Sequence, residues 1–198
     1  MIKCFKRYPI FKNFIYWALC ITLHSFFAKF AYSKGMSIGL LRVAPLYDLI
    51  QDVTPNLQPY RNIPEILHII PIAILVCYIL FFWNKTGSAC LSEFFVKHGT
   101  LMFVRGICFS VTLLPDSSQM CSLSNHFGSC FDLIFSGHST IMLLCTLLLV
   151  KYFPLNIVWK NILFGNVFLT SILIVLCRNH YTIDVIISLL LTYFVYKY

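Results

Sequence analysis

The chain of 198 residues is 59% hydrophobic and only 11% charged, with a formal net charge of +8. This composition excludes an ordinary soluble domain, in which apolar residues make up about half of the chain and charged residues about a quarter. It predicts an integral membrane protein whose excess positive charge meets anionic lipid, and not nucleic acid, because no basic and aromatic module accompanies the charge.

Six apolar stretches are long enough, or nearly so, to cross a bilayer as helices. Proline, glycine, asparagine and charged residues separate them, and such residues stop helices or restrict how they begin. The sequence therefore predicts a single all-α integral membrane domain over residues 1–198, a six-transmembrane-helix bundle with a short N-terminal segment at residues 1–13. In chain order the expected helices run from about Phe14 to Tyr32, Ile66 to Trp83, Gly99 to Leu114, His138 to Phe153, Ile157 to Cys177 and Thr182 to Tyr198.

The distribution of Lys and Arg predicts the orientation of the bundle. With the N-terminus in the cytoplasm, nine of these cations fall on the cytoplasmic side and five on the other side, with Arg105 inside the third helix. Short cytoplasmic loops are normally enriched in Lys and Arg. We expect a multi-pass protein with a cytoplasmic N-terminus and a first helix that is retained, because no clear small-x-small cleavage site follows it.

A first polar cluster marks the start of the fourth helix. Ser136 is a suitable cap, Gly137 lets backbone amides face a ligand, and His138 falls in the first turn. Free amides and the helix dipole favour an anion at such a place, phosphate in particular. The same three residues are also compatible with a capped helix that carries an interfacial histidine.

A second polar cluster joins the fifth and sixth helices. His180 and Asp184 are four positions apart and share one face if they lie on a helix. At about 4 Å and a dielectric constant near 20, a carboxylate attracts an imidazolium by roughly 4 kcal/mol, which is enough to hold the ring. The pair suits a nucleophile or base with an orienting carboxylate, although a helix-start Asp neutralised by a neighbouring His gives the same pattern.

Two such clusters on one side of a bundle favour a functional site. One histidine could attack phosphorus and form a phosphohistidine, while the other protonates the departing alkoxide and later deprotonates the acceptor hydroxyl. This chemistry requires no metal, so we expect no cofactor.

Two sequence motifs give the clusters a family resemblance. His180 to Val185 is a complete His-Tyr-Thr-x-Asp-Val segment. Cys130, Asp132, Ser136, Gly137 and His138 follow the pattern Cys-Gly-Asp-x-x-x-Ser-Gly-His-Thr, with Phe131 and Ser139 in place of Gly and Thr. These segments resemble the fourth and third motifs of the sphingomyelin synthase family, within the lipid phosphate phosphatase superfamily.

Two earlier segments resemble the remaining motifs of that family less closely. Residues 44–48, Ala-Pro-Leu-Tyr-Asp, partly keep the first motif, and the stretch from Arg105 to Pro115 resembles the second. The phosphatase signature of Lys, six spacers and Arg-Pro is absent, because Lys97 lies eight positions before Arg105 and Gly106 follows it. This departure favours the transferase branch without excluding hydrolysis.

The resemblance implies a lipid phosphotransferase of the lipid phosphate phosphatase fold. It implies transfer of phosphocholine from phosphatidylcholine to ceramide, giving sphingomyelin and diacylglycerol through a phosphohistidine. His180 would be the nucleophile, Asp184 its orienting partner, and His138 the acid and base on the lipid oxygens. The substrate-binding residues expected around them are Asp132, Ser136, Gly137, Arg105, Asp48 and Tyr181, although Arg105 could instead pair with an acid in the bundle.

Several alternatives stay open at the level of sequence. Water could replace the acceptor, as in a lipid phosphate phosphatase, or the chain could be a non-catalytic lipid-binding relative. The expected partners are membrane lipids, with a glycerophospholipid donor and a ceramide or diacylglycerol acceptor, and the headgroup and oligomeric state are open. The active site is expected on the luminal or exoplasmic side, in the Golgi or plasma membrane of a eukaryote.

The four remaining histidines and two of the cysteines carry weaker expectations. His24 and His68 are expected to be interfacial or packed, without a partner close in sequence, and His98 and His126 to be solvated. A disulfide between Cys121 and Cys130 is an open possibility, because both would lie in one non-cytoplasmic loop.

Overall fold

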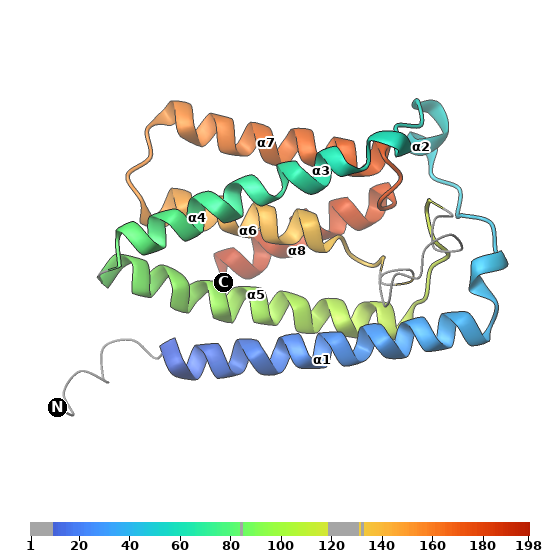
Figure 1. Cartoon of the computed structure of the whole chain (residues 1–198), viewed down its shortest axis with the longest axis horizontal. Helices are drawn as coiled ribbons and strands as arrows, with labels where there is room; N and C mark the ends of the chain where they lie inside the picture. Colours follow the sequence, from blue (N-terminus) through green and yellow to red (C-terminus); the bar gives the residue numbers. More distant parts are fainter. Residues whose placement is uncertain (1–9, 84, 119–130, 132) are drawn as a thin grey trace.

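The computed structural model describes residues 10–83, 85–118, 131 and 133–198, and within this part the chain contains helices and no strands (Figure 1). The all-α prediction is therefore confirmed. The α-helices are α1 (Ile10–Ser37), α2 (Leu49–Val53), α3 (Asn62–Leu67), α4 (Ile69–Phe81), α5 (Lys85–Val111), α6 (Gly137–Tyr152), α7 (Ile157–Leu176) and α8 (Thr182–Lys197), with short 3₁₀ turns at Leu40–Arg42 and Gln58–Tyr60.

Helix α6 lies at the centre of the bundle. It contacts α4, α5, α7 and α8, and Leu144, Leu148 and Leu149 along it are fully buried. Their neighbours in the core include Leu75 of α4 and Leu101 of α5. Because other helices surround α6, it does not need an apolar stripe toward lipid, and its buried face can include polar residues.

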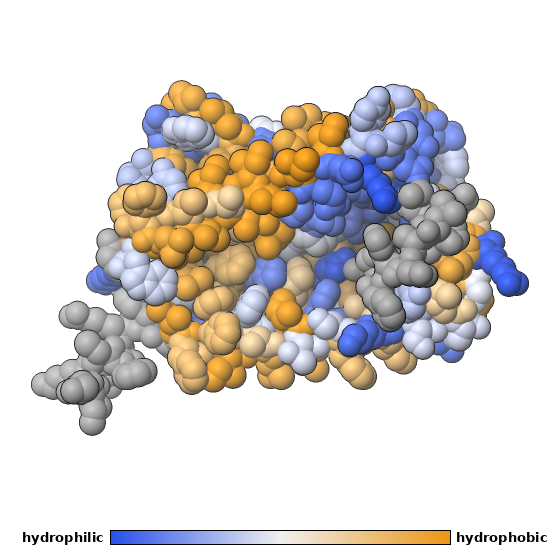
Figure 2. Space-filling view, in the orientation of Figure 1, coloured by the Kyte–Doolittle hydropathy of each residue, from blue (hydrophilic) through white to orange (hydrophobic). Residues whose placement is uncertain are grey.

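The outside of the bundle is strongly apolar. Large hydrophobic side chains stay exposed along α1, α4 and α7, for example Phe11, Phe26, Leu80 and Phe168. Figure 2 shows hydrophobic side chains over much of one face and hydrophilic ones gathered toward α2 and α3. An exposed apolar surface of this extent is stable in lipid and not in water.

Four helical segments are long and apolar enough to cross a membrane. They are Ile10–Ser37, Gln58–Phe81, Lys85–Val111 and Ile157–Leu176. Helices α6 and α8 have 16 residues each and are shorter than these four segments. Together these findings support an integral membrane helical bundle.

Helices α1 and α5 pack closely along their length. A Cβ atom added to Gly99 would lie 3.2 Å from the Cα of Trp17, a tighter contact than most Cβ atoms make, so glycine favours the observed close approach. Polar side chains then bond across the contact: Asn13 to Ser92, Tyr16 to Thr100, and Trp17 to His98. Small residues with interhelical hydrogen bonds are the usual means of helix association in lipid.

The start of α5 differs from the prediction. The helix begins at Lys85 and not near Gly99, so it has 27 residues and is not short. The polar residues in its first half have partners on other helices: the Glu93 carboxylate accepts from Lys151 Nζ and Tyr152 Oη, each at 2.6 Å. His98, expected in solvent, is instead buried and accepts from Trp17 Nε1 at 2.9 Å.

The second predicted helix also begins earlier and contains a break at His68, between α3 and α4. Pro71 has no amide hydrogen, so it cannot donate to the carbonyl of Leu67 four residues before it. Asn166 of α7 supplies the missing donor, with its Nδ2 at 3.2 Å from that carbonyl oxygen. The break is thus a consequence of one proline and is stabilised by a neighbouring helix.

Replacing Gly99 by Leu should destabilise the protein, because the new side chain would collide with the α1 backbone. Overpacking of this kind typically costs about 1–3 kcal/mol. Gly165→Leu is the matched control, since a Cβ at Gly165 meets nothing within 4 Å. Thermal unfolding in detergent should show a lower melting temperature for Gly99→Leu alone, and equal melting temperatures for both variants would contradict the close packing of α1 on α5.

Candidate active site

Helices α6 and α8 begin side by side at one end of the bundle, termed the site end, which lies toward α2 in Figure 1. Ser136 caps α6, with its Oγ accepting from the amide of Ser139 at 3.3 Å, as its sequence position predicts. The amide of Ser136 in turn donates to the carbonyl oxygen of Asp184 in α8 at 3.2 Å. This backbone bond fixes the first turns of the two motif helices against each other.

His180 and Asp184 form a buried pair at the start of α8. Nδ1 of His180 lies 3.6 Å from Oδ2 of Asp184, and their side chains are only 7% and 1% exposed. His180 precedes the cap residue Tyr181, so the two do not share a helical face as predicted but meet across the helix start. The same Asp184 oxygen accepts from the Tyr181 amide at 3.2 Å, which fixes the carboxylate. With Nδ1 facing the carboxylate, Nε2 of His180 is the nitrogen left for a substrate.

His138 belongs to a second imidazole–carboxylate pair. Its Nε2 lies 3.0 Å from Oε2 of Glu65, which projects from α3. Asn179 holds the other carboxylate oxygen of Glu65, donating from Nδ2 at 3.4 Å. The ring centroids of His138 and His180 are 6.2 Å apart. Two histidines, each with its own carboxylate, therefore meet at the site end.

Glu65 and His68 are the site residues that sequence reasoning missed. We expected His68 to have no partner close to it in the sequence. Its Nδ1 nevertheless lies 3.9 Å from Oε2 of Glu65, and its ring centroid lies 4.7 Å from that of His138. The available signal was the spacing of three positions between an acid and a histidine beside an apolar stretch. Their link to His138 joins residues far apart in the chain and carries no local signal.

The first turn of α6 offers amides to an anion. The described hydrogen bonds involve no donation from the amides of Gly137 or His138, whereas the first amide of α8, on Thr182, is bound to a carboxylate of the protein. The guanidinium of Arg105 lies directly beside Gly137, where a Cβ atom would be 3.5 Å from its central carbon. A helix N-terminus with a neighbouring cation is a favourable place for a phosphate group.

Arg105 is buried on α5 and supports the segment that leads into α6. Its Nε donates to the carbonyl oxygen of Phe135 at 2.6 Å, and Nη1 lies 2.9 Å from Nε2 of His24. These contacts connect α1, α5 and the start of α6. The sequence left open whether this cation binds phosphate or a bundle acid, and its position beside Gly137 is compatible with the former.

Asp48 joins α2 to the start of α8. Its carboxylate caps α2 by accepting from Ile50 and Gln51, and it also accepts from the amide and hydroxyl of Thr182 at 2.6 and 2.9 Å. Burial alone would raise the pKa of Asp48, but the hydrogen bonds from Thr182, Gln51 and Ile50 outweigh it and lower the pKa. The sequence predicted that Asp48 binds the substrate. Its described hydrogen bonds are all to the protein and hold α2 against the start of α8.

Tyr181 is a second connection at the site end. Its buried hydroxyl donates to the carbonyl of Pro115 at 2.9 Å and accepts from the amide of Leu46 at 3.0 Å. The segments after α1 and after α5 are thereby tied to the cap of α8. Like Asp48, Tyr181 makes described contacts that organise the segments around the histidines.

Some predicted features lie outside the described residues. These are Asp132, the proposed disulfide between Cys121 and Cys130, and His126. Phe131, which stands where the resembling motif has Gly, is described: it is buried against Tyr32 and Gly35 of α1. A Cβ on Gly35 would lie 2.4 Å from its ring, so Gly35 makes the room that this departure from the motif needs.

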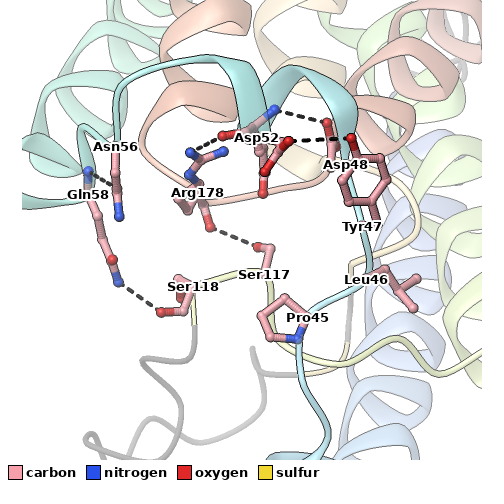
Figure 3. Close-up of a pocket in the computed structure, with 11 residues that line it drawn as sticks. Pro45, Leu46, Tyr47, Asp48, Asp52, Asn56, Gln58, Ser117, Ser118 and Arg178 are labelled. Atoms are coloured by element: carbon pink, nitrogen blue, oxygen red, sulfur yellow. Dashed lines mark hydrogen bonds between the residues drawn. The ribbon is translucent and has the colours of Figure 1, made fainter.

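A cavity of about 380 Å³ lies at the site end (Figure 3). Figure 3 shows Asp52 next to Tyr47, and Arg178 on the other side of Asp52, toward Asn56. Gln51, which also lines it, donates from Nε2 to the carbonyl oxygen of His180 at 2.9 Å. One residue that lines the cavity is therefore bonded to the backbone of His180. Neither His180 nor His138 lines the cavity itself.

Comparison with known proteins finds a family match in the C-terminal part of the chain. Residues 129–198, the segment that contains both motif histidines, match the family model described as PAP2 superfamily C-terminal. The C-terminal part of the chain is PAP2-like. The match supports the resemblance of this segment to the lipid phosphate phosphatase superfamily. It also supports lipid phosphate chemistry of the phosphatase or phosphotransferase type. A search of curated proteins found no match.

Asp48→Ala should lower the thermal stability at neutral pH, because four hydrogen bonds to the carboxylate are lost. The expected cost is about 1–3 kcal/mol. A lowered folded pKa means that the carboxylate stabilises the fold fully above its usual value of 3.8 and loses this effect as the pH falls through the folded value. The difference in melting temperature from wild type should therefore shrink on acidification.

Asp52→Ala is the matched control for Asp48→Ala. Asp52 lies in the same helix, and its described side-chain contact is a single long bond from Tyr47 Oη at 3.4 Å. Its replacement should change the melting temperature little at any pH. If Asp52→Ala and Asp48→Ala lowered it equally, the special role given to Asp48 would be wrong.

Proposed function

We propose that the protein is a lipid phosphotransferase that moves phosphocholine from phosphatidylcholine to ceramide through a phosphohistidine on His180. The observation that carries the proposal is the meeting of two imidazole–carboxylate pairs, His180 with Asp184 and His138 with Glu65, beside the first turn of α6. One pair suits nucleophilic attack and the other suits proton transfer. The choice of phosphocholine and ceramide rests on the resemblance of the two motifs.

In the first half-reaction, the donor phosphate binds at the first turn of α6, near Arg105. Nε2 of His180 attacks phosphorus, and a nitrogen–phosphorus bond forms as the bond to the glycerol oxygen breaks. The protonated His138 gives its proton to that oxygen, and diacylglycerol leaves. Asp184 stabilises the positive charge that develops on His180, with an attraction of about 5 kcal/mol at a dielectric constant near 20, before desolvation costs.

In the second half-reaction, neutral His138 takes the proton of the primary hydroxyl of ceramide. The hydroxyl oxygen attacks phosphorus, the nitrogen–phosphorus bond breaks, and sphingomyelin is released with both histidines restored. Glu65 stabilises His138 each time it is protonated. Because donor and acceptor are both lipids, the proposal needs no soluble substrate domain, and we propose the site to be on the side of the membrane opposite a cytoplasmic N-terminus.

His180→Ala and His138→Ala should each reduce transfer by at least about 10³-fold, because one removes the nucleophile and the other the proton donor. The assay is conversion of phosphatidylcholine and ceramide to sphingomyelin by purified protein in defined liposomes, followed by mass spectrometry. His98→Gln is the control, since His98 lies away from the site against Trp17. Activity of His180→Ala at the wild-type level would refute the phosphohistidine.

The same assay separates transfer from hydrolysis. Phosphocholine on a second lipid supports the proposal, whereas phosphocholine or phosphate released to solution would identify a lipid phosphate phosphatase. Absence of both products across donor headgroups, in protein that stays folded, would favour a non-catalytic lipid-binding relative.

Glu65→Gln should reduce transfer by about 10–10³-fold while leaving the attack by His180 possible, because an amide stabilises the His138 imidazolium less than a carboxylate. The measurement is a single turnover with labelled phosphatidylcholine. We expect slower appearance of diacylglycerol at unchanged thermal stability. A rate equal to that of wild type would show that Glu65 does not assist His138.

A further inference from the structure

We propose that Glu65, His68 and His138 form a binding site for a divalent transition metal ion such as Zn²⁺, and that the bound ion inhibits the protein by capturing His138. The inhibition rests on the proposed function, because it assumes the acid–base role of His138. The metal site itself does not depend on that role and can be tested without any activity.

The ligand set is one that zinc prefers. One carboxylate oxygen and two imidazole nitrogens lie within 4.8 Å of one another, and all three residues are partly exposed. Two histidines and one glutamate form a known zinc set that keeps a fourth position open for water or another oxygen ligand. With neutral imidazoles the occupied site would carry one net positive charge.

The distances between the ligand atoms fit a tetrahedral ion. Metal–ligand bonds of about 2.0–2.1 Å place tetrahedral ligand atoms about 3.3 Å apart. The Glu65 oxygen lies 3.0 Å from His138 Nε2 and 3.9 Å from His68 Nδ1, values that bracket this spacing. The two imidazole nitrogens lie within 4.8 Å of each other, so the side chains must rotate toward a common centre to close the site.

An observation on His68 supports the metal site independently of the proposed reaction. Its Nδ1 is buried and has no hydrogen-bond partner among the described residues, although it faces Glu65. The proposed reaction makes no use of this nitrogen. Glu65 and His68 also form a Glu-x-x-His sequence around the end of α3, a spacing that places two metal ligands on one side of a helix.

Occupation of the site opposes the proposed reaction. The nitrogen of His138 that faces Glu65 would be bound to the ion, and Glu65 would share its charge with the ion and no longer with the imidazolium. A histidine bound to a metal at one nitrogen cannot be an imidazolium, so the proton that stays on its other nitrogen belongs to a much weaker acid and is not given readily to the leaving lipid oxygen. The ion is thus an inhibitor that removal of metal reverses.

Titration of the metal-stripped, full-length protein in detergent with Co²⁺ tests the site directly. We expect one bound Co²⁺ per chain with the visible spectrum of a tetrahedral site, and its displacement by Zn²⁺. His68→Gln should weaken Co²⁺ binding by at least about 100-fold. Removing a metal ligand should cost at least as much affinity as removing a group that only hydrogen-bonds to a ligand. His98→Gln should bind as wild type does.

The outcomes separate the two proposals. Absence of tetrahedral Co²⁺, a thiolate charge-transfer band that indicates cysteine ligands, or equal binding by His68→Gln would overturn the metal site while leaving the transferase proposal untouched. In the liposome assay, Zn²⁺ should inhibit the wild-type protein, and EDTA should restore its activity. The rate of His68→Gln should be the same with and without that concentration of Zn²⁺. Inhibition of His68→Gln equal to that of wild type would overturn the regulatory part.

Discussion

The hydrogen bond from the Ser136 amide to the Asp184 carbonyl oxygen is the contact on which the geometry of the site depends. It joins the first turns of α6 and α8 and so holds the two motif histidines near each other, with their ring centroids 6.2 Å apart. Asp48 and Tyr181 then connect this pair of helix starts to the segments after α1 and α5. The two motifs act as one unit because their backbones are bonded, and not only because their side chains converge.

The apolar environment explains why so many polar groups at this end have partners within the protein. In lipid or in a buried bundle, an unpaired donor or acceptor costs several kcal/mol, so side chains that cap helix starts stabilise the fold. Ser136 caps α6, and Asp48 caps α2 and accepts a hydrogen bond from the first amide of α8. The amides of Gly137 and His138 have no such partner among the described bonds, and they lie where the phosphate group of the proposed substrate would bind.

The sequence predicted those features that depend on neighbours in the chain. Apolar length identified the helices, and local residue types identified the Ser136 cap and the closeness of His180 to Asp184. It did not predict the start of α5, because Glu93 is stabilised by Lys151 from another helix. It likewise missed the pairing of Glu65 with His138, since the two are distant in sequence and only the packing of α3 on the bundle brings them together.

The two imidazole–carboxylate pairs differ in exposure, and this difference bears on their roles. The His180 and Asp184 side chains are almost completely buried, whereas His138 is 35% and Glu65 43% exposed. A nucleophile that forms a phosphohistidine benefits from exclusion of water, which would otherwise hydrolyse the intermediate. An acid–base residue must instead reach oxygens that arrive and depart. The buried pair therefore suits the covalent step of the proposed reaction, and the exposed pair suits proton transfer.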